Sequence, residues 1–161
     1  MTAQLGRTVN RWVGFYVHDT GGVLRAIPIN SLSVVGIAYA EQDLTAFQDA
    51  VSGVLPNMPD APIDIGGPFD TITAQASPTL SGSHTILAGL NGETTPRTID
   101  VQFGIRHAFE EGEPQFGITA TAANGYICTN YTVNPSDMTY SASFRLYPGS
   151  AIPAWGTTSE A

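Results

Sequence analysis

The chain has 161 residues, about the length of one domain, and only 12% of them are charged, roughly half the share of about 25% in an average soluble protein. The net charge is −8 and all six cations are arginines, so the sequence lacks the basic patch with which proteins bind nucleic-acid phosphates or anionic membrane surfaces. So few charges are typical of a subunit whose surface is covered by neighbours in an assembly.

Alternation of apolar and polar residues with a period of two dominates the chain and is typical of half-buried strands. In chain order it predicts a strand over 11–18, a broken β-branched run over 27–39, and strands over 61–70, 98–106, 115–122, 125–133 and 138–147. Short turn sequences such as Asn124-Gly125 separate the last four strands, which predicts an antiparallel meander. The expected fold class is mainly β, an antiparallel β-sandwich or barrel with one flanking α-helix and extended terminal arms.

One segment breaks the β pattern. Apolar residues recur at spacings of three and four at Leu44, Phe47, Val51 and Val54. Acidic residues stand at the start of this segment, where the helix dipole favours them. The pattern predicts a helix over 41–54, lying across one end or face of the sheet; the run 84–90 is too short to assign.

The β domain is expected to span 11–147, with an N-terminal arm over 1–10 and a C-terminal arm over 148–161. A fully exposed Trp155 would leave a large apolar surface in water, so we expect the C-terminal arm to dock on its own domain or on a neighbour. The proline-rich stretch 55–68 is expected to be a stiff, extended loop able to reach outward. The residues predicted to contact other subunits are Trp12, Pro56, Pro59, Ile152 and Trp155.

The polar faces of the predicted strands carry Thr, Ser and Gln in place of the Lys and Glu that usually cover a solvated sheet. Short neutral side chains suit contact with a neighbouring subunit or a smooth channel wall. A Thr-rich face in solvent remains the alternative.

Candidate catalytic and ligand-binding groups are weak. A cluster of possible metal ligands follows one predicted strand: His107, Glu110, Glu111 and Glu113. Acids in a turn are more often simply solvated, so metal binding there stays open. The lone Cys128 is interpreted as a small core residue, and the sequence has no P-loop, dinucleotide, GxSxG or zinc pattern. We therefore predict that the protein is not an enzyme and takes no cofactor.

No stretch approaches 18 consecutive apolar residues, and residues 1–11 lack the apolar centre of a signal peptide. We therefore expect no contact with a membrane and a product that is made in the cytosol, or that joins a particle assembled there.

The order of several local sequences is distinctive. A first strand leads into His18-Asp19-Thr20-Gly21-Gly22-Val23-Leu24-Arg25, and an acidic segment begins Ala40-Glu41-Gln42-Asp43-Leu44. Next come Ile63-Asp64-Ile65-Gly66-Gly67-Pro68-Phe69-Asp70, the predicted meander and an exit at Tyr147-Pro148-Gly149-Ser150. This layout resembles the tail tube (major tail) proteins of siphophages over about residues 10–150.

The resemblance implies a domain that closes into hexameric rings, which stack head to tail into a hollow tube with termini and long loops bridging the rings. Its partners would be copies of itself and other tail proteins of the virion, and the tube would be assembled in the host cytoplasm. The lumen of such tubes is typically acidic and lets DNA pass without retaining it. The residues interpreted as facing the lumen are Asp64, Asp100 and Gln102.

Two other functions remain open. A head decoration or cement protein would form trimers or monomers on a capsid lattice. A small carbohydrate- or ligand-binding β-sandwich would use exposed aromatic residues such as Trp12, Tyr131 or Trp155.

Overall fold

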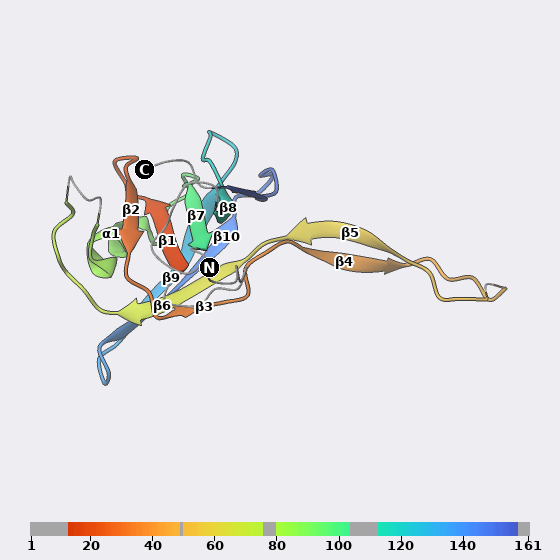
Figure 1. Ribbon diagram of the computed structural model, residues 1–161, viewed down its shortest axis with the longest axis horizontal. Helices are drawn as coiled ribbons and strands as arrows, with labels where there is room; N and C mark the ends of the chain where they lie inside the picture. The colour runs from red at the N-terminus through yellow and green to blue at the C-terminus, as the bar shows by residue number, and fades with distance from the viewer. Residues whose placement is uncertain (1–12, 49, 76–79, 104–112, 158–161) are drawn as a thin grey trace, which may run out of the picture.

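The computed structural model describes residues 13–48, 50–75, 80–103 and 113–157. In this part of the chain the protein is mainly antiparallel β with one short helix, which confirms the predicted fold class. Figure 1 shows a body built from two sheets and a long hairpin that projects from it.

A five-stranded sheet has the order β11-β8-β7-β1-β2. Its strands are β1 (Val13–His18), β2 (Leu24–Ile27), β7 (Ile99–Phe103), β8 (Pro114–Ile118) and β11 (Ala154–Thr157). The register pairs Phe15 with Val101 and Val101 with Phe116, so apolar residues from three neighbouring strands line up on one face. Their side chains are almost completely buried, as the alternating pattern predicts.

A four-stranded sheet has the order β3-β6-β10-β9. Its strands are β3 (Ser31–Leu32), β6 (Ile63–Pro68), β9 (Tyr126–Asn134) and β10 (Thr139–Leu146). Ile65 of β6 lies opposite Ala142 of β10, and both are buried. The pairing of β9 with β10 shifts register between Ser143 and Phe144, where the sheet carries a bulge or irregularity.

The two sheets share one core. The rings of Phe15 in the five-stranded sheet and Phe144 in the four-stranded sheet lie 5.7 Å apart between centroids, and both side chains are about 1% exposed. Burying an aromatic side chain of this size contributes roughly 1.5–3 kcal/mol. These contacts therefore hold the two sheets together.

The helix α1 (Ser83–Leu90) completes the core. Its buried residues follow a helical spacing, Ser83, Ile86, Leu87 and Leu90, so one face turns inward. The hydroxyl of Ser83 donates to the backbone oxygen of Pro68 at 2.9 Å, which ties the start of the helix to the end of β6. With eight residues, this helix of the described chain is not long enough to cross a membrane.

The helix predicted over 41–54 is wrong. The segment instead contributes to a two-stranded hairpin, in which β4 (Ala38–Asp43) pairs with β5 (Val54–Asp60). A helix gains most of its stability by burying an apolar face, and here Phe47 meets no core and is fully exposed. The side chain of Asp43 accepts a bond from the Thr45 backbone, a local contact that competes with helix formation.

The predicted meander is also wrong as a single sheet. β7 and β8 pair in the five-stranded sheet, whereas β9 and β10 pair in the four-stranded sheet, so the chain changes sheets between Ile118 and Tyr126. Backbone bonds join Arg97 and Tyr126 in both directions at 2.8 and 3.0 Å and fasten the start of β9. Gly125 lies where the chain passes from one sheet to the other, and its φ is +140°, a backbone conformation that residues with L side chains rarely adopt.

Candidate assembly surfaces

The most exposed feature of the protein is the hairpin arm, residues 38–60, formed by β4, β5 and the turn region between them (Figure 1). Its strands pair with each other and, among the described residues, with no other strand. Every residue of both strands is exposed. A two-stranded hairpin without a packed face is only marginally stable in water.

Hydrogen bonds close the far end of the hairpin arm. The Leu44 N–H donates to the Gly53 carbonyl at 2.9 Å, and the Gly53 N–H donates to the Thr45 hydroxyl at 2.8 Å. Asp43 Oδ1 accepts from the Thr45 N–H at 2.9 Å, and this bond holds the pKa of the Asp43 carboxyl below its usual value. The pairing of the two strands therefore continues past β4 and β5 to Leu44 and Gly53.

Those side chains are unusually apolar for solvent. The exposed large hydrophobic residues of the hairpin arm are Tyr39, Leu44, Phe47, Val51, Val54, Leu55 and Met58. Apolar surface concentrated in this way marks an interaction site more often than a solvated face. Pro56 and Pro59, predicted to contact other subunits, lie on this exposed surface in β5.

Both sheets also end in strands whose outer side pairs with no further strand among the described residues, although isolated bridges join Ala26 of β2 to Leu80 and two residues of β9 to the segment 91–97. β9 ends the four-stranded sheet over nine residues, and β2 and β11 end the five-stranded sheet. At its other side the four-stranded sheet ends in β3, which is only two residues long. On its outer side β9 is already bridged to Arg97 at Tyr126 and to Asn91 at Cys128, so only the rest of this edge presents backbone donors and acceptors that can pair with another chain.

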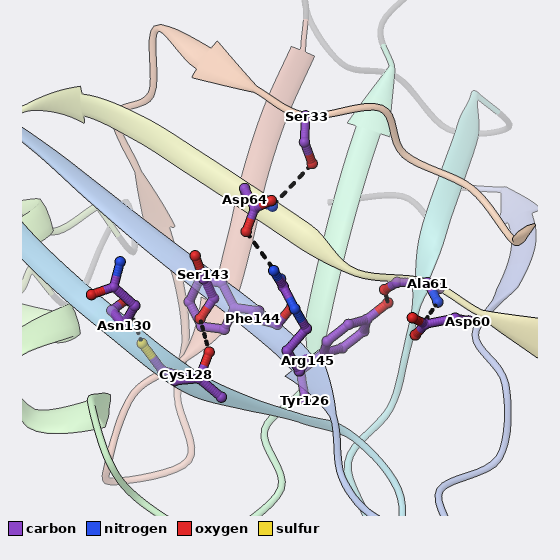
Figure 2. A network of polar contacts seen from close by, with 11 residues as sticks. Ser33, Asp60, Ala61, Asp64, Tyr126, Cys128, Asn130, Ser143, Phe144 and Arg145 are labelled. Carbon is purple, nitrogen blue, oxygen red and sulfur yellow. Dashed lines mark hydrogen bonds and ion pairs between the residues drawn. The ribbon is translucent and has the colours of Figure 1, made fainter.

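The outward face of the four-stranded sheet is open and nearly neutral. Asp64 and Arg145 form an ion pair at 3.0 Å with side chains 49% and 43% exposed, as Figure 2 shows. Partial burial raises the pKa of Asp64. Hydrogen bonds from Arg145 and Ser143 and the positive charge of Arg145 lower it by more, so the pKa of this carboxyl lies below its usual value. A hollow of about 410 Å³ lies along β3, β6 and β10 beside this pair.

The outward side of the five-stranded sheet is less open. Asp100 and Gln102 alternate with the buried residues of β7 and are themselves partly buried. Loss of hydration raises the pKa of Asp100, opposed by a hydrogen bond from Gln115 and by the charge of His18. Asp64 belongs to the other sheet, so a channel wall formed by one sheet would carry either Asp64 or the pair Asp100 and Gln102.

The C-terminal segment docks on its own domain over β11, which pairs with β8. The Trp155 ring lies 5.0 Å from that of Phe116 and 5.7 Å from that of Phe103, yet 52% of the residue stays exposed. Ile152 is half-buried, and Trp12 lies outside the described residues together with the predicted N-terminal arm.

Only some of the groups considered for chemistry lie among the described residues. Glu113 is buried, whereas His107, Glu110 and Glu111 lie outside the described residues. The described residues contain no cluster of three metal-ligating side chains. Cys128 is buried, and burial raises the pKa of its thiol. The Tyr131 hydroxyl lies 3.0 Å from His84 Nδ1, and both residues are partly buried.

Comparison by sequence identifies no relative: no protein-family model matches the chain, and no curated protein matches it significantly. Comparison by structure is informative. A chain from the sheath–tube complex of an extracellular contractile injection system, PVC in the extended state, has 8% identity and a TM-score of 0.55, with 94% of this chain and 93% of that chain covered.

Two further structures are similar. A chain of the PVC sheath/tube terminator has 9% identity and a TM-score of 0.56, covering 96% of this chain and 99% of that one. A chain of the anti-feeding prophage cap, a tube-terminating cap, has 9% identity and a TM-score of 0.61, covering 98% and 95%. At these identities the likeness establishes a shared fold. It is a fold found in contractile injection systems, and it does not single out siphophages.

Proposed function

We propose that this protein is the tube subunit of a phage-type tail, which assembles with copies of itself into stacked hexameric rings that form a conduit for DNA. The shared fold with tube and terminator structures supports a structural role in a tail. The sequence resemblance is to siphophage tubes and the similar structures are from contractile systems, so the proposal concerns the tube itself and not the kind of tail around it.

The observation that carries the proposal is the hairpin arm. It exposes Leu44, Phe47 and Met58 to solvent at 56%, 110% and 78%, far from the core of its own domain. Contact with another copy would bury this surface and stabilise the hairpin. In a tube, an arm of this kind suits contact with an adjacent subunit, including one in the next ring.

We assign the lumen wall to the outward face of the four-stranded sheet. That face is open, its strands β9 and β10 are the longest of the described residues, and its charges form the Asp64–Arg145 pair. Short Ser and Thr side chains and a neutralised ion pair offer DNA phosphates few cations to bind. The partly buried Asp100 belongs to the more covered face of the other sheet, which suits contact with surrounding protein.

Electron microscopy of the purified, concentrated chain tests the function. Tubes or six-fold rings are expected for the wild type, and Phe47→Ser should lower the assembled fraction while leaving the thermal unfolding temperature of the free chain unchanged, because Phe47 packs on nothing. Val23→Ser, at a residue 41% exposed in the β1–β2 turn, is the matched control and should assemble normally. A chain that stays monomeric at every concentration would contradict the proposal.

A second candidate is a tube terminator or cap, because two of the similar structures are described in those terms. Such a protein would form closed rings that do not stack into tubes. The same micrographs separate the two functions by the presence or absence of stacking, and trimers on a capsid lattice would instead favour a decoration protein.

A further inference from the structure

The hairpin arm leaves the body on two sides that are held differently. On the side of β5, the Tyr126 hydroxyl donates to the Ala61 carbonyl at 2.7 Å, and both residues are completely buried (Figure 2). Asp60 Oδ1, at the end of β5, accepts from the Ala61 N–H at 2.8 Å. Breaking a buried hydrogen bond leaves its groups unsatisfied, so these contacts fix the end of β5 to the start of β9.

The side of β4 is held by fewer contacts. At the end of β3, the Ser33 N–H donates to the Asp64 carbonyl at 2.9 Å. The residues that follow, Val34, Val35 and Gly36, form no backbone hydrogen bond within the described part of the chain. Val34 is 95% exposed. On this side the direction of the arm therefore depends on the side chains that lie against the segment.

The group beside Gly36 is the indole of Trp155. Gly36 stands just before β4 begins at Ala38, and its φ is +145°, a backbone conformation that residues with L side chains rarely adopt. A Cβ placed on Gly36 would stand 4.0 Å from Trp155 Cζ2, and beyond its chain neighbours it would meet no other atom of the described residues within 4 Å. The indole is therefore placed to support the base of the arm at Gly36.

Trp155 belongs to a strand that is itself weakly held. β11 has four residues, all of them exposed, and among the described strands it pairs only with β8. The Trp155 ring packs on those of Phe116 and Phe103. Short edge strands with exposed backbone hydrogen bonds open locally at a lower free energy than core strands. The support at Gly36 is therefore present only while β11 is docked.

We propose that β11 is a conformational switch for the hairpin arm. While β11 is paired with β8, the Trp155 indole supports the chain at Gly36 and the arm keeps one direction. When β11 is released, the arm hinges at residues 34–36 and samples many directions. An arm that is already ordered loses less conformational entropy when it meets another copy, so a docked β11 favours assembly. This last step rests on the proposed function, whereas the direction of the arm is a property of the single chain.

Distance measurements within one chain test the support. In a Cys128→Ala background, spin labels on Asn57→Cys in β5 and Ala88→Cys in α1, both exposed, report the direction of the arm in a dilute, unassembled sample. Trp155→Phe keeps an aromatic ring for Phe116 but lacks the outer ring of the indole that carries Cζ2. Its distance distribution should be roughly two-fold broader than that of the parent chain, because the restraint on the arm is lost. Unchanged widths in Trp155→Phe and Trp155→Ala would overturn the proposal.

A pair of glycine variants tests the hinge. Gly36→Ala should shift the distance between the two labels, because alanine disfavours the positive φ at the base of the arm. Gly22→Ala in the β1–β2 turn is the matched control: Gly22 has φ of +81°, and a Cβ there would meet nothing within 4 Å. It carries the same kind of backbone strain away from the arm and should leave the distance unchanged. Equal distances in the two variants would contradict a hinge at residues 34–36.

A disulfide across β8 and β11 tests the coupling to assembly. Gln115 and Gly156 are partners in this pairing, so Gln115→Cys with Gly156→Cys in the Cys128→Ala background places two thiols where a disulfide keeps β11 docked. The oxidised chain should assemble at least as well as the reduced chain, whereas Trp155→Phe should lower the assembled fraction roughly three-fold.

The outcomes separate this proposal from the proposed function. Loss of assembly on oxidation would show that β11 must leave its own domain, which contradicts the switch and leaves the proposed function standing. A broader arm distribution in Trp155→Phe, with no rings or tubes from any chain, would confirm the support at Gly36 and contradict the function.

Discussion

The carboxylate of Asp100 lies against the backbone of Gly117, its partner on the neighbouring strand β8. A Cβ placed on Gly117 would stand 2.4 Å from Asp100 Oδ1 and 2.1 Å from the Ile99 carbonyl oxygen. Backbone atoms cannot move aside as a flexible side chain can, so β7 and β8 approach this closely only because position 117 is glycine.

Gly117→Ala should therefore destabilise the protein. We expect a loss of about 1–3 kcal/mol, the usual cost of overpacking a close contact, and a melting temperature lower by about 2–4 °C for each kcal/mol. Gly156→Ala on the adjacent β11 is the control, because a Cβ there would meet nothing within 4 Å. Equal melting temperatures for the two variants would show that the strands are not held this closely.

Asp100→Asn should stabilise the protein at neutral pH. Because the folded-state pKa of Asp100 is raised, the folded chain holds this proton more tightly than the unfolded chain, whose Asp pKa is about 3.9. Ionisation then costs stability, and the cost appears as pH rises through the folded-state pKa. The amide removes it, so we expect a melting temperature higher by about 2–3 °C at pH 7 and no gain below about pH 4.

Asp64→Asn is the opposite case and serves as its control. The folded-state pKa of Asp64 is lowered, so its ionised form contributes stability above the unfolded pKa, and this contribution is lost as pH falls through the folded pKa. The amide should be slightly less stable than wild type at pH 7, since the pair with Arg145 is half-exposed, and equal to it at low pH. Thermal unfolding from pH 3 to pH 8 measures both variants.

Tyr126→Phe should remove a buried hydrogen bond. The Tyr126 side chain is completely buried and its hydroxyl donates to the Ala61 carbonyl at 2.7 Å, as Figure 2 shows. Losing this donor should cost about 1–2 kcal/mol in chemical denaturation. Tyr39→Phe, at a half-exposed residue of the hairpin arm, should leave the free energy of unfolding unchanged.

Trp155→Ala should loosen the C-terminal strand. The indole contacts Phe103 and Phe116 while 52% of the residue stays exposed, so we expect a loss of about 1–2 kcal/mol, well below that for a fully buried Trp. Hydrogen exchange should rise in β11 and β8. Unchanged exchange in both strands would show that Trp155 does not hold β11 to the sheet.

The strands of the core were predictable because their signal is local. In β1, β6, β7 and β10 the alternation of apolar and polar residues is regular, and the predicted inward residues of these strands are largely the buried ones, such as Phe15, Ile63 and Tyr140. The sequence carries no comparable signal for which strands pair with one another. Nothing in the turn around Asn124 and Gly125 indicates that β8 and β9 belong to different sheets.

The hairpin arm was missed for a related reason. Leu44, Phe47 and Val51 have helical spacing, and a pattern alone does not say whether a core exists to receive it. The outward-reaching loop predicted over 55–68 is wrong: residues 54–60 form the exposed strand β5 of the arm, and residues 63–68 form β6, whose alternate residues are buried in the core. The four-residue strand β11 is too short to show periodicity, so that its pairing with β8 could be found only from the structure.

The way in which the hairpin arm joins the body has a mechanical consequence. β5 runs on into β6, and β6 pairs along its whole length with β10 (Figure 1). A pull along the arm therefore loads the β6–β10 ladder parallel to its strands. The hydrogen bonds of this ladder share the force instead of breaking one after another. A force on an arm that is bound by another copy would therefore act directly on the four-stranded sheet.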